Sequence, residues 1–262
     1  MATPCRIMEI RIYLTGRVTL EVDGNVAVHE HQFRGKQGRL LFTYLASERT
    51  RPVPREELAK IIWPGEMALS WEVALSALIS RLRGLLSPDG LKNQGIALSS
   101  SFGQYHLRLP KDTWIDLEAV TSAVDNAEGA LRSGGADPQG VLGPATVAVS
   151  IARRPFLSGI EGEWVESQRR KLERQLLRAL DCLSTMWLRI GEPSLAVETA
   201  TQTVALDPFR ERSYQLLMHA YDASGNKAEA VRLYHRLAEI LAAELGTGPS
   251  AKTEAIYSGL LR

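Results

Sequence analysis

The sequence predicts a mostly α-helical protein with a small β portion, arranged as an α+β domain over residues 1–110 and an all-α domain over residues 111–262. Three observations lead to this fold class. Apolar residues alternate between residues 10 and 28 and again before Pro110, which is the pattern of strands. Beyond Asp112 they recur at helical spacing throughout. Residues 187–246 also contain an internal repeat.

Composition excludes several classes of protein. Hydrophobic residues make up 45% of the 262-residue chain and charged residues 23%, which is typical of globular proteins and not of disordered ones. No apolar run reaches the roughly 18 residues of a membrane-spanning helix, and charges interrupt the opening residues too often for a secretory signal. Cys5 and Cys182 lie too far apart to indicate a disulfide framework or a zinc site. We therefore expect a cytoplasmic protein without a membrane partner.

Charge is distributed unevenly between the two parts. Residues 1–110 contain 14 Lys and Arg against 10 Asp and Glu, whereas the remainder contains 17 against 20. The first part is therefore net positive and the second net negative. This asymmetry permits an anionic partner for the first part but does not require one.

The first residues predict a small antiparallel meander. Three alternating segments, IRIYLTG, VTLEVDG and VAV, lie between Ile10 and Val28, and Gly-containing turns separate them. His29 and His31 follow, and on a strand their spacing puts both rings on one face. No third or fourth ligand accompanies them, so no metal site is expected.

Three helices and a hairpin are predicted to follow. Helical spacing begins at Lys36 and stops before Arg51-Pro52. The expected helices cover residues 36–50, 54–63 and about 70–86. Pro88-Asp89-Gly90 then marks a turn, and GIALSS and QYHLRLP read as a β-hairpin around residues 100–103.

The third predicted helix has two contrasting faces. One face is apolar and belongs in the core: Leu75, Leu78, Ile79, Leu82 and Leu86. The opposite face is small: Val73, Ser76, Ala77, Ser80 and Gly84, with Arg81 and Arg83 on its flanks. Small residues between arginines suit close approach to a polyanion, because the backbone can enter a groove while guanidinium groups reach phosphates or guanine edges. The alternative is a surface helix whose arginines are only solvated.

A helix, a turn, a longer helix and a hairpin form the winged helix-turn-helix layout, in which the last helix enters the major groove of DNA. The candidate DNA contacts on that helix are Arg81, Arg83, Ser80, Ser76, Ala77 and Val73. Arg34, Lys36, Gln37 and Arg39 begin the first helix, where they either anchor a phosphate or form a solvated cap. Ser100, Phe102 and Gln104 are candidates on the hairpin, or wing, beside a neighbouring groove.

The second part reads as helices at residues 116–132, 138–153 and 163–191, followed by a repeat. Leu172, Leu176, Leu180 and Leu183 form a stripe on the third of these, and Cys182 lies on its apolar side as a core residue.

The repeat has a period of 34 residues, which relates Gly191 to Gly225, Ala196 to Ala230 and Trp187 to Tyr221. Asp207-Pro208 ends a helix in the first copy, whereas the second copy runs on to Gly246. This pattern predicts tetratricopeptide-like helical pairs, with Gly at the turn and Ala where helices approach closely.

Nothing in the sequence indicates catalysis or a cofactor. Neither a Ser/His/Asp arrangement nor a paired-carboxylate motif rises above chance, and a G-x-x-x-x-G-K-[ST] loop is absent. We expect a protein that is not an enzyme.

The chain resembles the Streptomyces antibiotic regulatory protein (SARP) family of transcriptional activators. RGKQGRLLFTYLA, VPREELAKIIWP, ISRLRGLL and GQYHLRL carry the resemblance to its winged-helix domain. DLEAV, EWVESQRRKLERQLLRAL and DPFRERSYQLLMHAYDASGNKAEAVRLYHRLAEILAAELGTGP resemble its bacterial transcriptional activation domain. The resemblance implies binding of short direct repeats in double-stranded promoter DNA, recruitment of RNA polymerase holoenzyme, formation of a homodimer and control of a secondary-metabolite pathway from the nucleoid.

Two positions depart from the family pattern. The family often has an arginine where Ser76 or Ala77 stands here, which puts the usual operator in doubt. Gly84 replaces a residue that is often basic in the family, which weakens the expected grip on phosphate. The competing hypothesis is an adaptor or signal-sensing protein that binds a peptide or ligand with its helical repeats and retains a vestigial winged helix.

Overall fold

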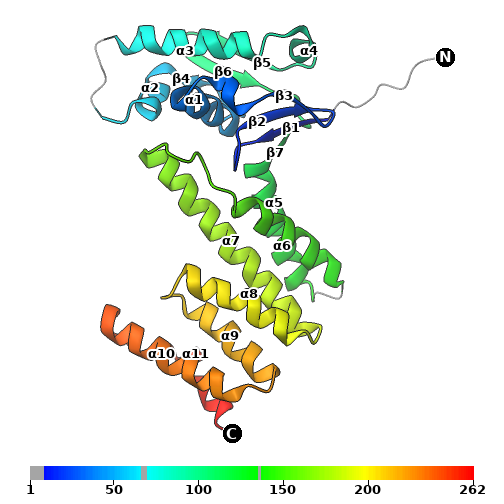
Figure 1. Cartoon of the computed structure of the whole chain (residues 1–262), viewed down its shortest axis with the longest axis vertical. Coiled ribbons are helices and arrows are strands. Elements are labelled where there is room, and N and C mark those ends of the chain that lie inside the picture. Colours follow the sequence, from blue (N-terminus) through cyan, green and yellow to red (C-terminus); the bar gives the residue numbers. More distant parts are fainter. Residues whose placement is uncertain (1–8, 66–69, 135–136) are drawn as a thin grey trace, which may run out of the picture. The chain divides into compact units, whose positions relative to one another are not determined.

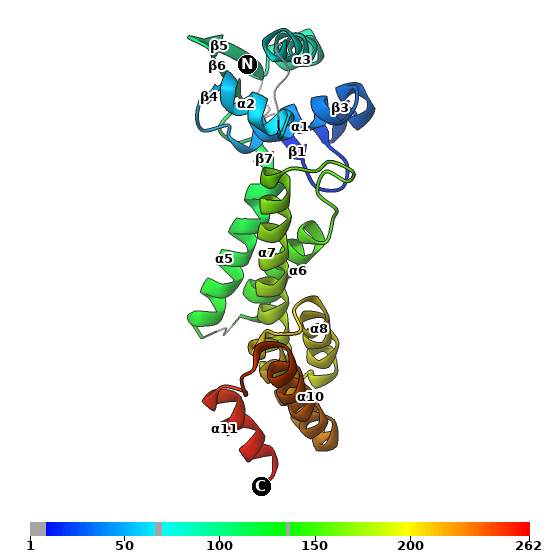
Figure 2. The same ribbon diagram turned by 90° about the vertical axis from the view of Figure 1, so that its left-hand side faces the viewer.

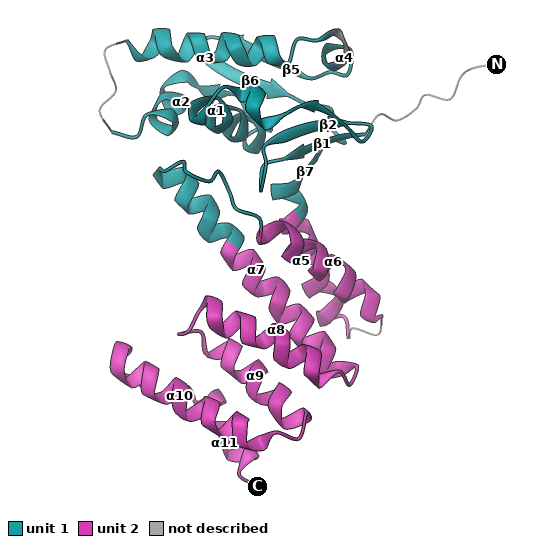
Figure 3. Cartoon of the chain, viewed as in Figure 1, with its two compact units in different colours: residues 1–119, 154–172 teal, residues 120–153, 173–262 magenta. Residues whose placement is uncertain are grey.

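The computed structural model describes residues 9–65, 70–134 and 137–262. The chain forms two compact units, one of residues 1–119 with 154–172 and one of residues 120–153 with 173–262 (Figure 3). The first unit mixes strands and helices, and the described part of the second is helical (Figure 1). The predicted fold class, mostly α with a small β portion, is confirmed.

A four-stranded sheet with the order β3-β2-β1-β7 opens the first unit. Its meander of β1 (Ile10–Tyr13), β2 (Thr19–Val22) and β3 (Asn25–Val28) is antiparallel, as the alternation predicts. The fourth strand, β7 (Trp114–Ile115), pairs parallel with β1, and no local sequence pattern predicts it. The sheet therefore joins segments separated by a hundred residues.

The residues after the meander do not continue as a strand. Residues 30–33 form the 3-10 helix η1 (Glu30–Phe33), and His29 is its N-cap. The side chain of Gln32 accepts a hydrogen bond from the His29 backbone at 2.7 Å, which closes the turn. His29 and His31 therefore lie at a 3-10 helix and not on a strand, and their rings stack with centroids 5.5 Å apart.

Three helices form the body of the first unit. They are α1 (Lys36–Ser47), α2 (Arg55–Ile62) and α3 (Trp71–Leu85), close to the predicted ranges. Their buried residues include Phe42, Leu58 and Ile79, which are almost fully removed from solvent. Burying side chains of this size stabilises the fold by roughly 1.5–3 kcal/mol each. The three helices thus share one core.

The predicted hairpin is present and has an additional strand. Strands β5 (Ala97–Ser101) and β6 (Gln104–Arg108) pair antiparallel, and β4 (Val53–Pro54) adds to the other edge of β6. Phe102 and Gly103, both at positive φ, make the two-residue turn. A one-turn helix, α4 (Asp89–Lys92), stands where the sequence predicted only a turn. Figures 1 and 2 show α3 beside this hairpin.

Asp116 joins the start of the next helix to the sheet. Its buried carboxylate accepts hydrogen bonds from the backbone of Leu14 at 3.0 Å and of Thr15 at 2.9 Å, and from the Thr15 hydroxyl at 2.7 Å. Burial raises the pKa of Asp116, and the hydrogen bonds from Thr15 and Leu14 oppose that rise. The carboxylate therefore replaces water as the acceptor for three donors at the end of β1.

Residues 154–172 return to the first unit. Phe156 bridges to Thr15, and the Gly16 backbone donates to the carbonyl of Pro155 at 2.7 Å. Trp164 packs edge-on against Tyr44 of α1, with ring centroids 4.9 Å apart. The first unit is therefore built from two stretches of sequence.

The remaining elements are helices of the predicted kind. Helices α5 (Asp116–Arg132) and α7 (Glu163–Arg189) begin in the first unit and continue in the second, which adds α6 (Pro138–Ala152) and α8 to α11. The last four cover Pro193–Leu206, Glu211–Ala223, Lys227–Leu245 and Ala251–Leu260. The predicted stripe of leucines on α7 is buried, and so is Cys182. Burial raises the pKa of the Cys182 thiol to about 12.

The two copies of the repeat end their first helices in the same way. The backbone of Glu192 donates to the carbonyl of Trp187 at 2.9 Å, and that of Asn226, 34 residues later, donates to Tyr221 at 2.8 Å. A hydrogen bond from a backbone N–H to the carbonyl five residues earlier is characteristic of a Schellman cap. Gly191 and Gly225 supply the positive φ that the cap needs. Ala196 and Ala230 are fully buried, as the tetratricopeptide-like pattern predicts.

Candidate nucleic-acid interface

Helix α3 presents the small face that its sequence predicts. Its apolar residues are buried, whereas Ser76, Ala77, Ser80 and Gly84 are exposed. Val73 has 72% of its surface exposed, which is unusual for an aliphatic side chain in a helix. Neither a large side chain nor a carboxylate interrupts this face after Glu72 in the first turn. The helix backbone is thus open to close approach from solvent.

The two arginines beside this face differ in their surroundings. Arg81 is exposed, and within the described residues its side chain has no hydrogen-bond or ion-pair partner. Arg83 is half-buried and donates from Nε to the carbonyl of Leu98 at 3.1 Å and from Nη2 to Ser100 Oγ at 2.7 Å. Arg83 therefore connects the last turn of α3 to the wing, and Arg81 is free to meet a ligand.

The beginning of α1 is positively charged but only partly free. Arg34, Lys36 and Gln37 are exposed, whereas Arg39 forms an ion pair with Glu30 at 2.9 Å. The N-cap of α1 is Gly35, no side chain caps the helix, and its first turn has no acidic residue. The first backbone N–H groups are left without side-chain acceptors, an arrangement that favours an anion.

The wing tip lies against the start of α2. The Arg55 backbone donates to the carbonyl of Gly103 at 3.0 Å, so β4 holds the turn in place. Phe102 is fully exposed at this turn, and Gln104 is exposed beside it. The Arg55 side chain reaches Glu56 and Glu72 at 2.9 and 3.3 Å, and its hydrogen bond lowers the pKa of Glu56. This exposed pairing occupies the Arg55 guanidinium.

The structure brings the predicted residues into three groups within the first unit. The α3 face contains Val73, Ser76, Ala77, Ser80 and Arg81; the start of α1 contains Arg34, Lys36, Gln37 and Arg39; and the wing contains Ser100, Phe102 and Gln104, with Arg83 bonded to it. Sequence reasoning missed Arg55, whose place follows from the pairing of β4 with β6, and no local signal reports that pairing.

In residues 9–65, 70–134 and 137–262 there is no group of three or more His, Cys, Asp or Glu side chains arranged to hold a metal ion. In the same ranges no helix is both long and apolar enough to cross a bilayer.

Comparison with known proteins agrees with the class that this fold defines, a winged helix joined to a helical repeat domain. A model of the bacterial transcriptional activator domain matches residues 115–261. The regulatory protein AfsR of Streptomyces coelicolor is 30% identical over 226 residues, which are 86% of this chain and 22% of AfsR. The transcriptional regulatory protein MoaR1 of Mycobacterium tuberculosis is 25% identical over 229 residues, which are 86% of this chain and 71% of MoaR1.

A solved structure has the same fold. It is that of Mycobacterium tuberculosis EmbR in complex with a low affinity phosphopeptide, with a TM-score of 0.82 at 21% identity over 97% of this chain and 65% of EmbR. The chain belongs to the bacterial transcriptional activator domain family and, with it, to the SARP family of transcriptional regulators. It spans about a fifth of the length of AfsR.

Proposed function

We propose that the chain is a sequence-specific transcriptional activator. In this proposal α3 enters the major groove of double-stranded promoter DNA at short direct repeats, and the protein helps to recruit RNA polymerase holoenzyme. Residues 1–110 bind DNA, and residues 111–262 form the activation domain, which also serves self-association as a homodimer. The pathway under control is one of secondary metabolism, and the protein works at the nucleoid.

The observation that supports DNA binding most strongly is the exposed face of α3. A major groove about 12 Å wide admits a helix, and small side chains let its backbone approach the bases. Val73 and Ala77 are exposed apolar groups of the kind that contact thymine methyls, and Ser76 and Ser80 can bond to base edges or phosphates. Arg81, which has no partner among the described residues, reaches a guanine edge or a phosphate.

The two flanking groups support the same arrangement. The start of α1, which no side chain caps, suits a phosphate together with the exposed Arg34 and Lys36. Phe102, fully exposed at a turn held by Arg55, suits contact with an adjacent groove. Contacts of this kind set the position of a protein on the duplex, whereas base contacts from α3 set the sequence.

Fluorescence polarisation of labelled promoter fragments from the neighbouring genes tests the proposal with the full chain. We expect salt-sensitive binding that is stronger for fragments with direct repeats than for scrambled ones. Arg81→Ala should cost about 1–3 kcal/mol of binding if Arg81 reads guanine, or lower the salt slope by about one unit if it meets a phosphate.

Arg17→Ala is the matched control, because Arg17 is an exposed arginine of the first unit outside the proposed interface. Equal binding by Arg81→Ala and the control removes Arg81 from the interface. Absence of sequence-selective binding to any fragment would refute the activator proposal and favour an adaptor that works through its helical repeats.

A further inference from the structure

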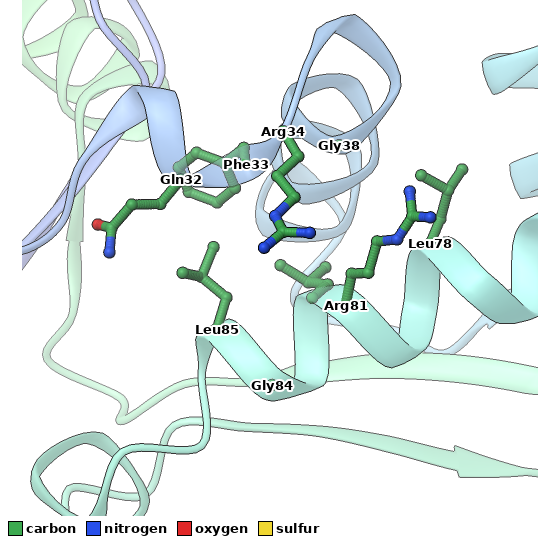
Figure 4. A pocket seen from close by; sticks show the side chains of 9 residues that line it. Gln32, Phe33, Arg34, Gly38, Leu78, Arg81, Gly84 and Leu85 are labelled. Atoms are coloured by element: carbon green, nitrogen blue, oxygen red, sulfur yellow. The ribbon is translucent and has the colours of Figure 1, made fainter.

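A pocket of about 430 Å³ lies between η1, the first turn of α1 and the second half of α3. Figure 4 shows side chains from both sides of it: Phe33 and Arg34 come from the chain leading into α1, and Leu78, Arg81 and Leu85 come from α3. All of these residues belong to the first unit. The volume falls within the range of about 300–1,000 Å³ that is usual for small-molecule sites.

The inner part of the pocket is apolar. Phe33, Leu78 and Leu82 line it and are each less than a tenth exposed, and Leu85 is half-buried beside them. A ligand that covers these groups gains the roughly 25 cal/mol per Å² that accompanies removal of apolar surface from water. The pocket therefore offers a small apolar floor that a ring or alkyl group of a ligand can cover.

The rim of the pocket carries two positive charges without compensation. Arg34 and Arg81 are both exposed, and in the described part of the chain neither guanidinium has a hydrogen-bond or ion-pair partner. Figure 4 shows the Arg34 side chain extending from the turn before α1 toward the side of α3 from which Arg81 rises. None of the described lining residues is acidic. Two like charges beside an apolar surface favour an anion, and guanidinium groups bind carboxylates in bidentate geometry.

Two glycines shape the pocket. At Gly38 a Cβ would lie 1.8 Å from the carbonyl oxygen of Phe33, so glycine is required for η1 to pack against α1 and form one wall. At Gly84 a Cβ would meet nothing within 4 Å, so the space above α3 there is unfilled. Gly84 is in helical backbone and accepts a larger side chain without strain.

We propose that this pocket binds an amphipathic organic carboxylate, a small molecule with one carboxylate and a ring or alkyl body. The carboxylate is held by Arg34 and Arg81, and the apolar body covers Phe33, Leu78 and Leu82. A DNA phosphodiester fits less well because it has no apolar body for the inner surface. The regulatory consequence rests on the proposed function: since Arg81 is shared, bound carboxylate weakens DNA binding.

Titration of the full chain with naphthoate tests the site in the absence of DNA. Calorimetry and saturation-transfer NMR measure the binding. We expect saturable binding, and at least about tenfold weaker binding of the uncharged naphthamide, because the amide loses the charge-assisted hydrogen bonds. Equal binding of acid and amide, or no saturable binding of the acid, would overturn the proposal. This comparison uses the natural chain and does not depend on any variant.

Two variants and a control locate the site. Arg34→Gln should weaken naphthoate binding about tenfold by removing one charge, and Gly84→Leu should abolish it by filling the pocket. Arg17→Gln removes the same charge elsewhere on the first unit and should leave naphthoate affinity unchanged. Thermal unfolding confirms that each variant is folded. Folded Arg34→Gln and Gly84→Leu proteins that bind naphthoate as the natural chain does would place the ligand elsewhere.

A competition experiment separates this inference from the proposed function. Naphthoate should raise the apparent Kd of the full chain for the promoter fragment in polarisation measurements. DNA binding that saturating naphthoate leaves unchanged refutes the competition. If naphthoate binds and no fragment does, the carboxylate site stands and the activator proposal fails. If fragments bind and naphthoate does not, the proposed carboxylate site is refuted and the activator proposal stands.

Discussion

Arg83 donates a hydrogen bond from Nη2 to Ser100 Oγ at 2.7 Å, and a second from Nε to the carbonyl of Leu98 at 3.1 Å. These bonds tie the last turn of α3 to strand β5 of the wing. Two residues that the sequence marks as separate DNA contacts are thus partners of each other. Arg83 has a role in holding the wing whether or not it also touches DNA.

Arg83→Ala should therefore affect the wing more than the salt dependence of DNA binding. We expect the free energy of unfolding to fall by about 1 kcal/mol. The salt slope of DNA binding should differ less from that of the natural chain than it does in Arg81→Ala. Chemical denaturation and polarisation at several salt concentrations measure the two effects. A double-mutant cycle with Ser100→Ala should be non-additive; additive losses would mean that the bond contributes nothing.

Asp116→Ala should destabilise the first unit strongly. The substitution leaves the backbone donors of Leu14 and Thr15 and the Thr15 hydroxyl buried without an acceptor, so we expect a loss of about 3 kcal/mol or more. Urea denaturation followed by tryptophan fluorescence measures it. Asp112→Ala removes an exposed carboxylate four residues earlier and should change stability by less than about 0.5 kcal/mol. Comparable losses in the two variants would contradict the assigned role of Asp116.

Gly191→Ala and Gly225→Ala should each destabilise the helical repeats by about 1 kcal/mol. Gly191 has a φ of +80° and Gly225 a φ of +76°, where a Cβ is unfavourable. Gly129→Ala is the matched control, because Gly129 lies inside α5 and a Cβ there meets nothing within 4 Å. The control should raise stability by up to about 1 kcal/mol through helix propensity. Thermal unfolding of the three variants should therefore show shifts of opposite sign.

Glu57 should contribute stability that depends on pH. A hydrogen-bonded pairing with Arg51 lowers the pKa of Glu57, and the Tyr44 hydroxyl also donates to it, at 2.5 Å. An acid whose pKa is lower in the folded state contributes stability above its unfolded pKa and loses it as pH falls through the folded value. The stability difference between the natural chain and Glu57→Gln should thus be full near pH 7 and shrink below about pH 4.5.

Denaturation of both proteins across that range measures the difference. Glu21→Gln is the control, because Glu21 forms no ion pair within the described residues. A difference for Glu57→Gln that stays constant down to pH 3 would contradict the role of the Arg51 pairing.

Local patterns were sufficient for most elements of the fold. The bounds of α5 follow from apolar spacing, and Gly246 marks the end of α10, where it adopts a left-handed conformation. The two faces of α3 also follow, because a helix converts a spacing of three and four residues into a common side. The contrast between a small outer face and an apolar inner one is visible in the sequence itself.

Pairings between distant segments were not visible in the sequence. Strands β4 and β7 have two residues each and too little alternation to be recognised, and β7 pairs with β1 across a hundred residues. The return of residues 154–172 to the first unit depends on contacts such as Trp164 with Tyr44. The 3-10 helix at His29 and His31, which the Gln32 side chain closes, also has no signal in the apolar pattern.

The sequence by itself determined which side chains each helix buries and which it exposes, because that depends on periodicity within one element. Only the tertiary structure decided which of the charged side chains have a hydrogen-bond or ion-pair partner. Arg83 is bonded to the wing, and Arg39 is paired with Glu30. Arg34 and Arg81, at the rim of one pocket, have no partner in the part of the chain that the structure describes. Whether an arginine is free or occupied depends on groups that chain topology brings to it, and periodicity contains no information about them.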